Sequence, residues 1–413
     1  MPTLIGDELH GLLSCPAAPL VAGSLQRRSR QVRLAPVPRH NDPLAPGEAL
    51  LYLATCPQQG GNAAGIAAAV APDDKLTASI ARSAVEEWAA AGSDRMLLAA
   101  ASPWCSGAIH AASMSREAAA SHDGSGKTIR ILGPTALPPE TVTELRGRGA
   151  VPVSSLADAE EGDVVVFPAH GVTNEIRSQA ADRGLIVIDA TCPLVAQAQE
   201  IASRYASRGQ HLVLIGPQDA AATTPIAGRT GGNVTLVENV AGTTALDLTD
   251  ARRISYLLQP GMSVEAAQGI VAALRSRFPA ATSTQPGGLC YAASDRASGI
   301  RAVATGSDIV LVAGNPQSAD ARQLAAQARE SDTRVQIVGA VEEITPAMLT
   351  GVTTIGVAES TSARAGLAEN VITAISGLGL LKVARRQVST ELVDIGPDAA
   401  LADADAELAA TSS

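Results

Sequence analysis

Three cysteines occupy the same kind of position at similar intervals along this 413-residue chain. Cys105, Cys192 and Cys290 each open a segment with helical spacing, and the first two directly follow apolar runs, MLLAAASPW and LIVIDAT. The amino end of a helix carries partial positive charge and free N–H groups, which lower a thiol pKa and stabilise thiolate. The pattern predicts one cysteine in each of three similar units, with the three thiols directed at a shared centre.

Thiolates placed in this way are ligands for iron–sulfur clusters or for zinc. Three cysteines can hold three irons of a cubane cluster and leave the fourth iron open, which suits substrate chemistry. Structural zinc usually has four protein ligands, often with a close pair of cysteines, and this sequence contains no C-x₂₋₄-C pair. From spacing alone, three unrelated buried cysteines remain an equal alternative.

From about residue 96, apolar runs alternate regularly with helical segments, and these elements must position the cysteines. Apolar runs of mainly Val, Ile, Leu and Ala lie at 96–101, 128–133, 163–169, 185–190, 211–216, 254–259, 308–314, 334–339 and 354–360, and most are separated by helical segments. Such runs are typical of parallel strands joined by crossover helices. The sequence therefore predicts the α/β class, with three pseudo-threefold α/β units around the cysteines.

The composition changes at both ends of this region. Residues 1–45 are rich in Pro, Arg and Ser and predict a loosely ordered lead-in, whereas 46–95 predict an N-terminal extension of α/β type. The three units are expected over 96–390, followed by a polar, Ala-rich frayed tail at 391–413.

The overall composition excludes several classes of protein. Hydrophobic residues make up 46% and charged residues 17%, a balance that excludes wholesale disorder. A net charge of −10, with only 2 Phe, 4 Tyr and 2 Trp, argues against nucleic acid as a partner. No window reaches the roughly 18 apolar residues of a membrane span, and the first basic run follows the apolar stretches instead of preceding them. We expect a cytoplasmic protein without a disulfide framework.

Longer motifs around the cysteines resemble those of the LytB/IspH family, the 4-hydroxy-3-methylbut-2-enyl diphosphate reductases. The segments 169–172 (AHGV) and 189–195 (DATCPLV) resemble two motifs of that family. The segment 103–107 (PWCSG) resembles its GFCAGV, and 289–292 (LCYA) with Asp295 and Arg296 resembles its ICYAT-x-NRQ. The resemblance extends over about 96–390 in the same order.

This resemblance implies a [4Fe-4S] cluster with one open iron, held by Cys105, Cys192 and Cys290. It also implies the reductive dehydroxylation of an allylic alcohol, a small-molecule substrate, with electrons from a ferredoxin or flavodoxin. His170 would serve as an anion anchor or proton relay, and Ser318 and Ser362 would help to bind the substrate.

Other positions depart from the family pattern. Gly133 stands where the family has a histidine, and its IGH-x-x-HPE segment reads IGPQDAAA at 215–222, without the histidines or the glutamate. Its TQTT and SSNS segments read LQPG at 258–261 and QSAD at 317–320, and ESTS at 359–362 is acidic. Because hydrogen-bond donors to a diphosphate are missing together, we expect a diverged paralogue with a different substrate.

Two alternatives stay open. One is the ordinary diphosphate reductase with an altered pocket. The other is a non-catalytic electron-transfer or redox-sensing protein, which would follow if Cys56 were a fourth ligand. Cys56 lies in ATCP at 54–57, which repeats the tetrapeptide at 190–193, and we interpret this as a coincidence. Cys15 is expected to be uninvolved.

Five polar residues near these motifs have structural explanations that we prefer to functional ones. His110 is expected to be an exposed helical residue, and Asp189 to cap the turn before Cys192. The remaining three, Asp219, Thr223 and Thr224, fit a solvated loop, although they could replace the missing acid or donors.

Overall fold

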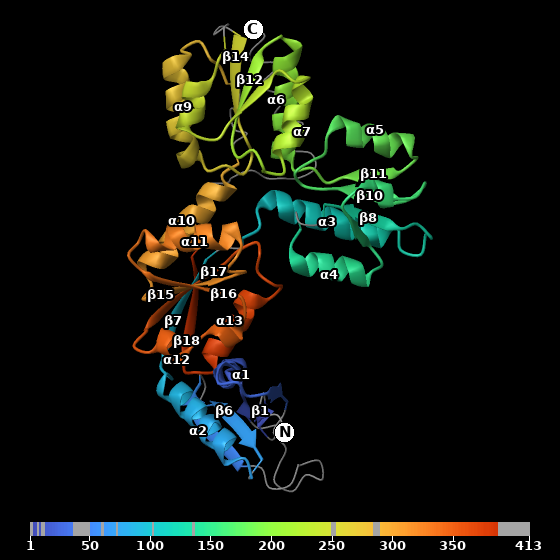
Figure 1. Ribbon diagram of the computed structural model, residues 1–413. Helices are drawn as coiled ribbons and strands as arrows, with labels where there is room; N and C mark the ends of the chain where they lie inside the picture. Colours follow the sequence, from blue (N-terminus) through green and yellow to red (C-terminus); the bar gives the residue numbers. More distant parts are fainter. Residues whose placement is uncertain are drawn as a thin grey trace. The chain divides into compact units, whose positions relative to one another are not determined.

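The chain folds as two compact units, and the second is inserted into the sequence of the first. The computed structural model describes residues 3–386, apart from 6–7, 10–12, 36–49, 59–61, 72, 101–102, 134–136, 249–252 and 284–289. The first unit combines Met1–Pro103 with Ala297–Val388, and the second contains Trp104–Arg296 (Figure 1). The tail expected at 391–413 and the end of the lead-in, 36–45, lie outside the described residues.

The first lobe of the second unit is a parallel sheet with helices on both faces. Its strands are β8 (Ile129–Leu132), β9 (Val151–Val153), β10 (Val164–Phe167) and β11 (Ile186–Asp189), in the order β11-β10-β8-β9. Its helices are α3 (Ser106–Ser121), α4 (Pro139–Gly147), η3 (Leu156–Asp158) and α5 (Asn174–Asp182). Helices α3 and α4 lie on one face of this sheet and α5 lies on the other (Figure 1). Val164 and Val166 pack in the cluster with α3 and α4, whereas Val165 and Phe167 pack in the cluster with α5. This alternation explains why β10 is apolar throughout.

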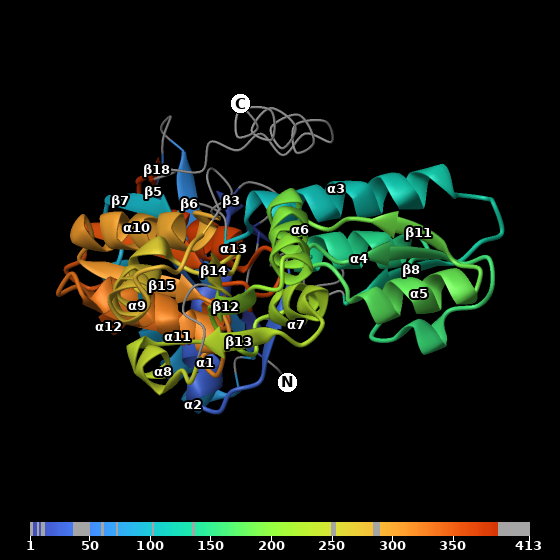
Figure 2. The same cartoon turned by 90° about the horizontal axis from the view of Figure 1, so that it is seen from above.

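The second lobe repeats this plan with three parallel strands. These are β12 (His211–Ile215), β13 (Val234–Val237) and β14 (Ile254–Leu258), in the order β13-β12-β14. Its helices are α6 (Pro193–Ser207), α7 (Thr223–Ala227), η4 (Gly228–Thr230), α8 (Val240–Ala245) and α9 (Val264–Arg277). Helices α6 and α9 lie on opposite sides of this sheet (Figure 2). Leu212 and Leu214 pack in the cluster with α6, while Val213 and Ile215 pack in the cluster with α9.

The third lobe belongs to the first unit and has a five-stranded parallel sheet. The strands are β7 (Arg95–Ala100), β15 (Ile309–Ala313), β16 (Arg334–Val338), β17 (Thr354–Glu359) and β18 (Leu381–Arg386), in the order β16-β15-β17-β7-β18. The helices are α10 (Ala292–Thr305), α11 (Ala319–Arg329), η6 (Val341–Glu343), α12 (Pro346–Leu349) and α13 (Leu367–Ser376). Three lobes of parallel α/β type confirm the predicted fold class.

The N-terminal extension forms a further mixed sheet in the first unit. Its elements are β1 (Thr3–Ile5), β2 (Glu8–Leu9), β3 (Leu13–Ser14), α1 (Ala18–Arg27), β4 (Val32–Leu34), β5 (Leu50–Pro57), β6 (Ala63–Val70) and α2 (Lys75–Ala90). Strands β4-β1-β6-β5 pair in that order. Where the sequence predicted a loosely ordered lead-in, the structure has the buried helix α1. Its Gly23 lies against the backbone of Glu342 in η6, and Arg27 donates to the carbonyls of Glu342 and Ile344.

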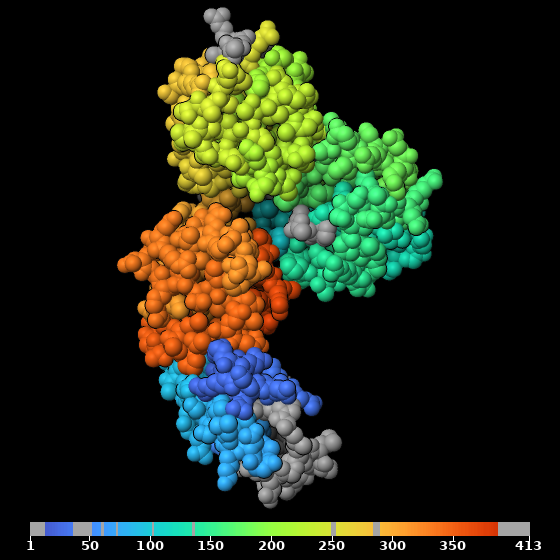
Figure 3. Space-filling view, viewed as in Figure 1, coloured from blue at the N-terminus to red at the C-terminus, as the bar shows by residue number. Residues whose placement is uncertain are grey.

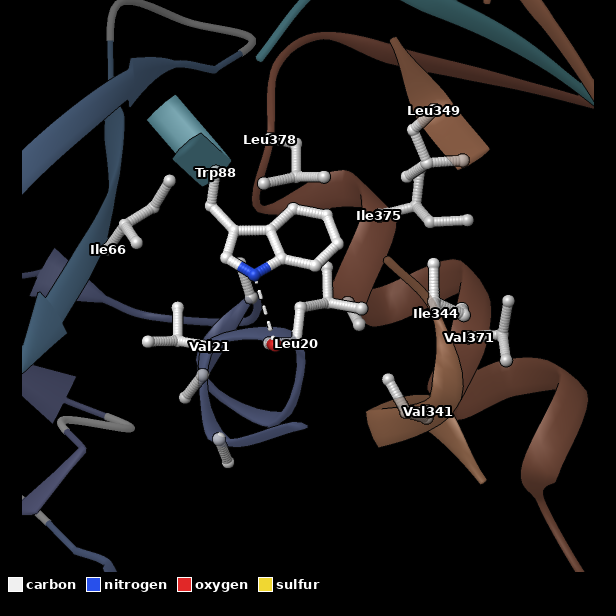
Figure 4. Close-up of a cluster of buried hydrophobic side chains, with 14 of the residues drawn as sticks. Leu20, Val21, Ile66, Trp88, Val341, Ile344, Leu349, Val371, Ile375 and Leu378 are labelled. Carbon is white, nitrogen blue, oxygen red and sulfur yellow. Dashed lines mark hydrogen bonds between the residues drawn. The ribbon is translucent and has the colours of Figure 1, made fainter. Parts of the chain in front are cut away.

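One hydrophobic core joins the extension to the third lobe. Leu20 and Val21 of α1 and Trp88 of α2 pack in the same buried cluster as Val371 of α13 (Figure 4). Leu25 of α1 belongs to this cluster as well. The indole N–H of Trp88 donates to the carbonyl of Leu20 over 3.1 Å, so the ring is hydrogen-bonded as well as buried. In the space-filling view, the blue residues of α1 lie directly against the orange and red elements of the third lobe (Figure 3). The extension is therefore an integral part of the first unit.

An ion pair at the amino end of β10 predicts pH-dependent stability. Asp163 Oδ2 accepts from Arg130 Nε over 2.8 Å, and the Asp163 side chain is only 9% exposed. Burial alone would raise the pKa of Asp163, but hydrogen bonds from Glu160 and Arg130 hold it below its usual value. A carboxylate with a lowered pKa stabilises the fold fully above its unfolded pKa of about 3.9, and this contribution is lost as pH falls from that value through the lower pKa of the folded state.

The substitution Asp163→Asn is therefore expected to destabilise the second unit by about 1–3 kcal/mol at pH 7. Below about pH 4 the difference from wild type should shrink, because Asp163 of the unfolded wild-type chain is then protonated and Asp163 of the folded chain follows at lower pH, where its own lowered pKa lies. Urea unfolding at several pH values measures this difference. A loss of stability in Asp163→Asn that stays constant from neutral to acidic pH would show that the charge of Asp163 does not contribute.

Candidate functional site

Each lobe has a point where loops leave the carboxyl ends of neighbouring strands in opposite directions. In open α/β sheets this topological switch point is where ligands bind. In the first lobe it lies between β8 and β10, because β9 lies beyond β8 and β11 lies beyond β10. His170 follows β10 and Gly133 follows β8, so both sequence-predicted positions lie at this switch point.

The switch point of the third lobe lies between β15 and β17, and it contains the two predicted serines. Ser318 is the N-cap of α11 and makes no side-chain cap hydrogen bond, and Ser362 follows β17. Ser362 Oγ accepts from the N–H of Asn315 over 3.1 Å and lies 2.7 Å from Ser360 Oγ. Asp320 Oδ2 accepts from both the N–H and the hydroxyl of Thr361, at 2.7 and 2.8 Å. The polar groups of the two loops are thus largely hydrogen-bonded to each other.

The switch point of the second lobe lies between β12 and β14, where the family motif is degenerate. Thr223 is buried, and its hydroxyl donates to the carbonyl of Pro217 over 2.8 Å. The buried amide of Gln259, which follows β14, is hydrogen-bonded to the same hydroxyl. Thr223 therefore has a structural role, and Thr224 is exposed but lies in helix α7, so the expected solvated loop is wrong for these two residues. Asp219 is exposed in the preceding turn, as expected.

At both Cys105 and Cys192, extended chain turns into a helix. Cys105 is the N-cap of α3 and Cys192 is the N-cap of α6, with Pro193 in the first turn of α6. Proline suits this place because its fixed φ fits the helix and the N–H that it lacks would have no helical partner. Cys290 lies two residues before Ala292, the first residue of α10. The predicted placement of the cysteines at helix starts is thus observed for two of them directly.

The three sulfur atoms converge inside the second unit. A Cβ atom at Gly107 would lie 2.6 Å from Cys192 Sγ and 3.9 Å from Cys105 Sγ, so only glycine leaves room for these thiols. Cys290 is half-buried and packs against the hydrophobic cluster that contains Cys192. Burial raises the pKa of Cys192 to about 11, N–H groups of Leu194 and Val195 oppose the rise, and Cys105 and Cys290 add to it. The last effect requires the three thiols to be near one another.

The spacing of these donors is informative about what they can hold. Within the part of the chain that the structure describes, no group of three His, Cys, Asp or Glu side chains is arranged to hold a single metal ion. Sulfur binds a single zinc ion at about 2.3 Å, which requires closely converging donors. Thiolates are the usual ligands of iron–sulfur clusters, which contain several metal atoms and bind to cysteines from separate parts of a chain.

The backbone joins the Cys192 turn to the loop that carries His170. The N–H of Cys192 donates to the carbonyl of Ala169 over 2.8 Å, one residue before His170. Surrounding protein lowers the pKa of the exposed His170 by desolvating its charged form. His170 is therefore a mainly neutral imidazole at pH 7, able to donate one hydrogen bond and accept another.

Other sequence candidates lie away from these loops. His110 lies on helix α3 as predicted, but it is half-buried and not exposed as expected. Cys56 lies within strand β5 and not at a helix start, so its tetrapeptide ATCP has a different local structure from that around Cys192. Both Cys56 and Cys15 are buried in the core that the extension shares with the third lobe.

Sequence reasoning missed the polar partners around the Cys192 turn. Asp189 accepts from the N–H of Thr191, as the expected cap would, but it also forms an ion pair with Arg177 on α5. Arg229 of η4 donates to Gln199 of α6 over 2.9 Å. No local signal in the sequence links these residues, because their proximity depends on how α5 and η4 pack beside β11 and α6.

No helix among the described residues is both long enough and apolar enough to span a membrane.

Comparison with known proteins gives consistent matches. The family model described as LytB protein matches residues 96–376. A 4-hydroxy-3-methylbut-2-enyl diphosphate reductase of Mycobacterium bovis is 37% identical over 259 residues, which are 62% of this chain and 79% of that protein. The reductase of the same name from Chromohalobacter salexigens is 35% identical over 242 residues, 58% of this chain and 76% of that protein.

A solved structure extends the likeness to the fold. The structure of the E-1-hydroxy-2-methyl-but-2-enyl-4-diphosphate reductase from Plasmodium falciparum has a TM-score of 0.61 and 20% identity, and the match covers 76% of this chain and 99% of that one. At this identity the similarity establishes the architecture of the three lobes. Together with the family model and the sequence relatives, it shows that the chain belongs to the LytB family of reductases.

Proposed function

We propose that this protein is an iron–sulfur reductase that removes the hydroxyl group of an allylic alcohol, with a [4Fe-4S] cluster held by Cys105, Cys192 and Cys290. The observation that carries the proposal is the convergence of these three thiols, two of them at helix N-caps. Family membership supports the same reaction class. Ferredoxin or flavodoxin is the proposed electron donor.

The residues present fit such a cluster. The missing Cβ at Gly107 leaves space beside two of the sulfurs, and N–H groups of α6 offset part of the burial that raises the pKa of Cys192. When bound, a four-iron cluster with three cysteine ligands supplies electrons and one iron that is open to a substrate oxygen. His170 would donate or accept a hydrogen bond as a neutral imidazole, because its pKa is lowered. Ser318 and Ser362 are the proposed contacts at the switch point of the third lobe.

The proposed substrate is not the diphosphate of the family. A diphosphate is multiply charged, and each charge-assisted hydrogen bond that it loses costs roughly 1.5–3 kcal/mol. At the third-lobe switch point, Thr361 gives both of its donors to Asp320, an anionic group beside the amino end of α11. At the second-lobe switch point, the hydroxyl of Thr223 is engaged with Pro217 and Asp219 adds negative charge. These groups favour a substrate without phosphoryl groups.

The ordinary diphosphate reductase is the second candidate. Its support is the 37% identity to a relative that carries this name. A non-catalytic electron-transfer protein, which would need Cys56 as a fourth ligand, has less support, because Cys56 is buried in the core of the first unit.

Anaerobic reconstitution with iron and sulfide, followed by Mössbauer spectroscopy, tests the proposal. A four-iron cluster with one distinct iron is expected, and 4-hydroxy-3-methylbut-2-enyl diphosphate should leave that iron unperturbed. A perturbed distinct iron would favour the ordinary reductase. Failure to form a cluster with all three cysteines intact would overturn the proposed catalytic function.

A further inference from the structure

We infer that Asp189 is a positioning residue, whose carboxylate fixes the Cys192 turn and couples it to the loop that carries His170. The inference rests on the proposed function, because the turn is positioned in order to present Cys192 as a ligand. Its evidence is a set of contacts on both sides of the turn.

The carboxylate of Asp189 uses both of its oxygens. Asp189 is the last residue of β11, and its Oδ1 accepts from the N–H of Thr191 over 3.1 Å and from the Thr191 hydroxyl over 2.5 Å. Oδ2 accepts from Arg177 Nη1 of α5 over 2.6 Å. The carboxylate therefore connects the end of β11 and the turn before Cys192 to helix α5.

The fixed turn also touches the loop that carries His170. A Cβ atom at Gly171, where φ is +74°, would lie 3.2 Å from the methyl group of Thr191, so Thr191 fits between Asp189 and Gly171. One residue later, the N–H of Cys192 donates to the carbonyl of Ala169. The loop that carries Cys192 and the loop that carries His170 are thus joined by two contacts, the packing of Thr191 near Gly171 and the hydrogen bond from Cys192 to Ala169.

A second guanidinium group lies near the same carboxylate. Burial lowers the pKa of Arg229, the nearby charge of Arg177 lowers it further, and Asp189 opposes both effects. Arg229 also donates to Gln199 on α6, the helix that Cys192 caps. Asp189 therefore carries negative charge near arginines from two lobes, Arg177 of α5 and Arg229 of η4.

A purely stabilising role accounts poorly for this arrangement. The side chains of Arg177 and Asp189 are 32% and 37% exposed, and ion pairs with such exposure contribute little to stability. A proton-donating role is also unsuitable, because burial raises the pKa of Asp189 but hydrogen bonds from Thr191 and Arg177 lower it below its usual value. Fixing the geometry of Cys192 is the role that agrees with both observations.

The test measures the reactivity of Cys192 in reduced, cluster-free full-length protein. Iodoacetamide labelling, followed by peptide mass spectrometry, gives the rate for Cys192 relative to Cys105 in the same molecules. Asp189→Ala should raise this relative rate by about tenfold, because the turn then opens locally. Asp189→Asn should restore part of the protection, since an amide oxygen can still accept from Thr191. Reconstituted Asp189→Ala protein should bind less iron than wild type.

The matched control is Asp163→Ala, which removes a more deeply buried ion pair at the amino end of the neighbouring strand β10. It should lower the melting temperature and leave the relative rate of Cys192 unchanged. Equal effects of Asp163→Ala and Asp189→Ala on Cys192 would overturn the inference and leave Asp189 with a structural role. If Asp189→Ala does not fold, Thr191→Val provides the same comparison, because it removes only the hydroxyl bond to Asp189.

Different results would contradict the proposed cluster function and the positioning role of Asp189. If wild type forms no cluster but Asp189→Ala still exposes Cys192, the proposed function fails and the positioning role stands. If wild type forms the cluster and Asp189→Ala changes neither labelling nor iron content, the positioning role fails alone.

Discussion

A chain carrying Cys192→Ser is expected to lose the iron–sulfur cluster. Serine keeps the size of the side chain, but its hydroxyl stays protonated at neutral pH and does not replace a thiolate ligand. Loss of a direct ligand should weaken metal binding by more than the roughly 10–100-fold typical of substitutions at outer partners. Iron and sulfide content after anaerobic reconstitution, together with the visible absorption of the cluster, measures the effect.

Cys56→Ser is the matched control for this prediction. Cys56 is as buried as Cys192 but belongs to the core of the first unit, so its substitution should leave the iron content unchanged. Loss of the cluster in this variant would instead make Cys56 a ligand and favour the electron-transfer alternative. Full iron content in Cys192→Ser would show that the assigned ligand set is wrong.

Trp88→Ala is expected to destabilise the first unit by about 3–5 kcal/mol. Trp88 has no exposed surface, and its indole N–H is hydrogen-bonded to the carbonyl of Leu20 and to Ser24 Oγ. Its removal would leave a large cavity between the extension and the third lobe, and would also leave the Leu20 carbonyl without its indole partner. Urea unfolding followed by circular dichroism should show a transition at lower denaturant concentration.

Fluorescence of the second tryptophan reports on the unfolding of the second unit in the same experiment. The chain has 2 Trp, and the other, Trp104, belongs to the second unit. In Trp88→Ala, tryptophan fluorescence therefore follows the second unit, and its transition should match that of wild type. Leu76→Ala on the same helix is the control, because Leu76 is 63% exposed and its loss should change stability by less than about 0.5 kcal/mol. If Trp88→Ala and Leu76→Ala had the same free energy of unfolding, the prediction that the extension and the third lobe share a stabilising core would be contradicted.

The elements with strong local patterns could be predicted from the sequence. All nine of the expected apolar runs contain strands, because a strand buried on both faces needs an uninterrupted apolar run. The helix starts at Cys105 and Cys192 were predictable for a related reason, since each follows such a run and precedes helical spacing. Short strands such as β9 and β18 were missed, because three to six residues with mixed polarity give no distinct pattern.

Features that depend on distant parts of the chain could not be predicted. Helix α1 has Pro and Arg at its ends and resembles a linker by composition, but it is stabilised by η6 and α13, which are more than 300 residues away in the sequence. The ion pair between Arg177 and Asp189 depends in the same way on the packing of α5 beside β11. For the candidate site, residue types and spacing indicated the cysteines, whereas their polar partners required the tertiary structure.

The split of the first unit has a consequence for synthesis on the ribosome. Strand β7 pairs with β17 and β18, so the sheet of the third lobe closes only after residue 386 has been made. The second unit ends at Arg296 and needs none of the later residues for its own sheets. At about 5–20 residues per second, it has several seconds to fold while β7 waits for its partner strands β17 and β18. Until η6 and α13 have also been made, the buried side chains of α1 and α2 that pack against these two helices lack that part of their core.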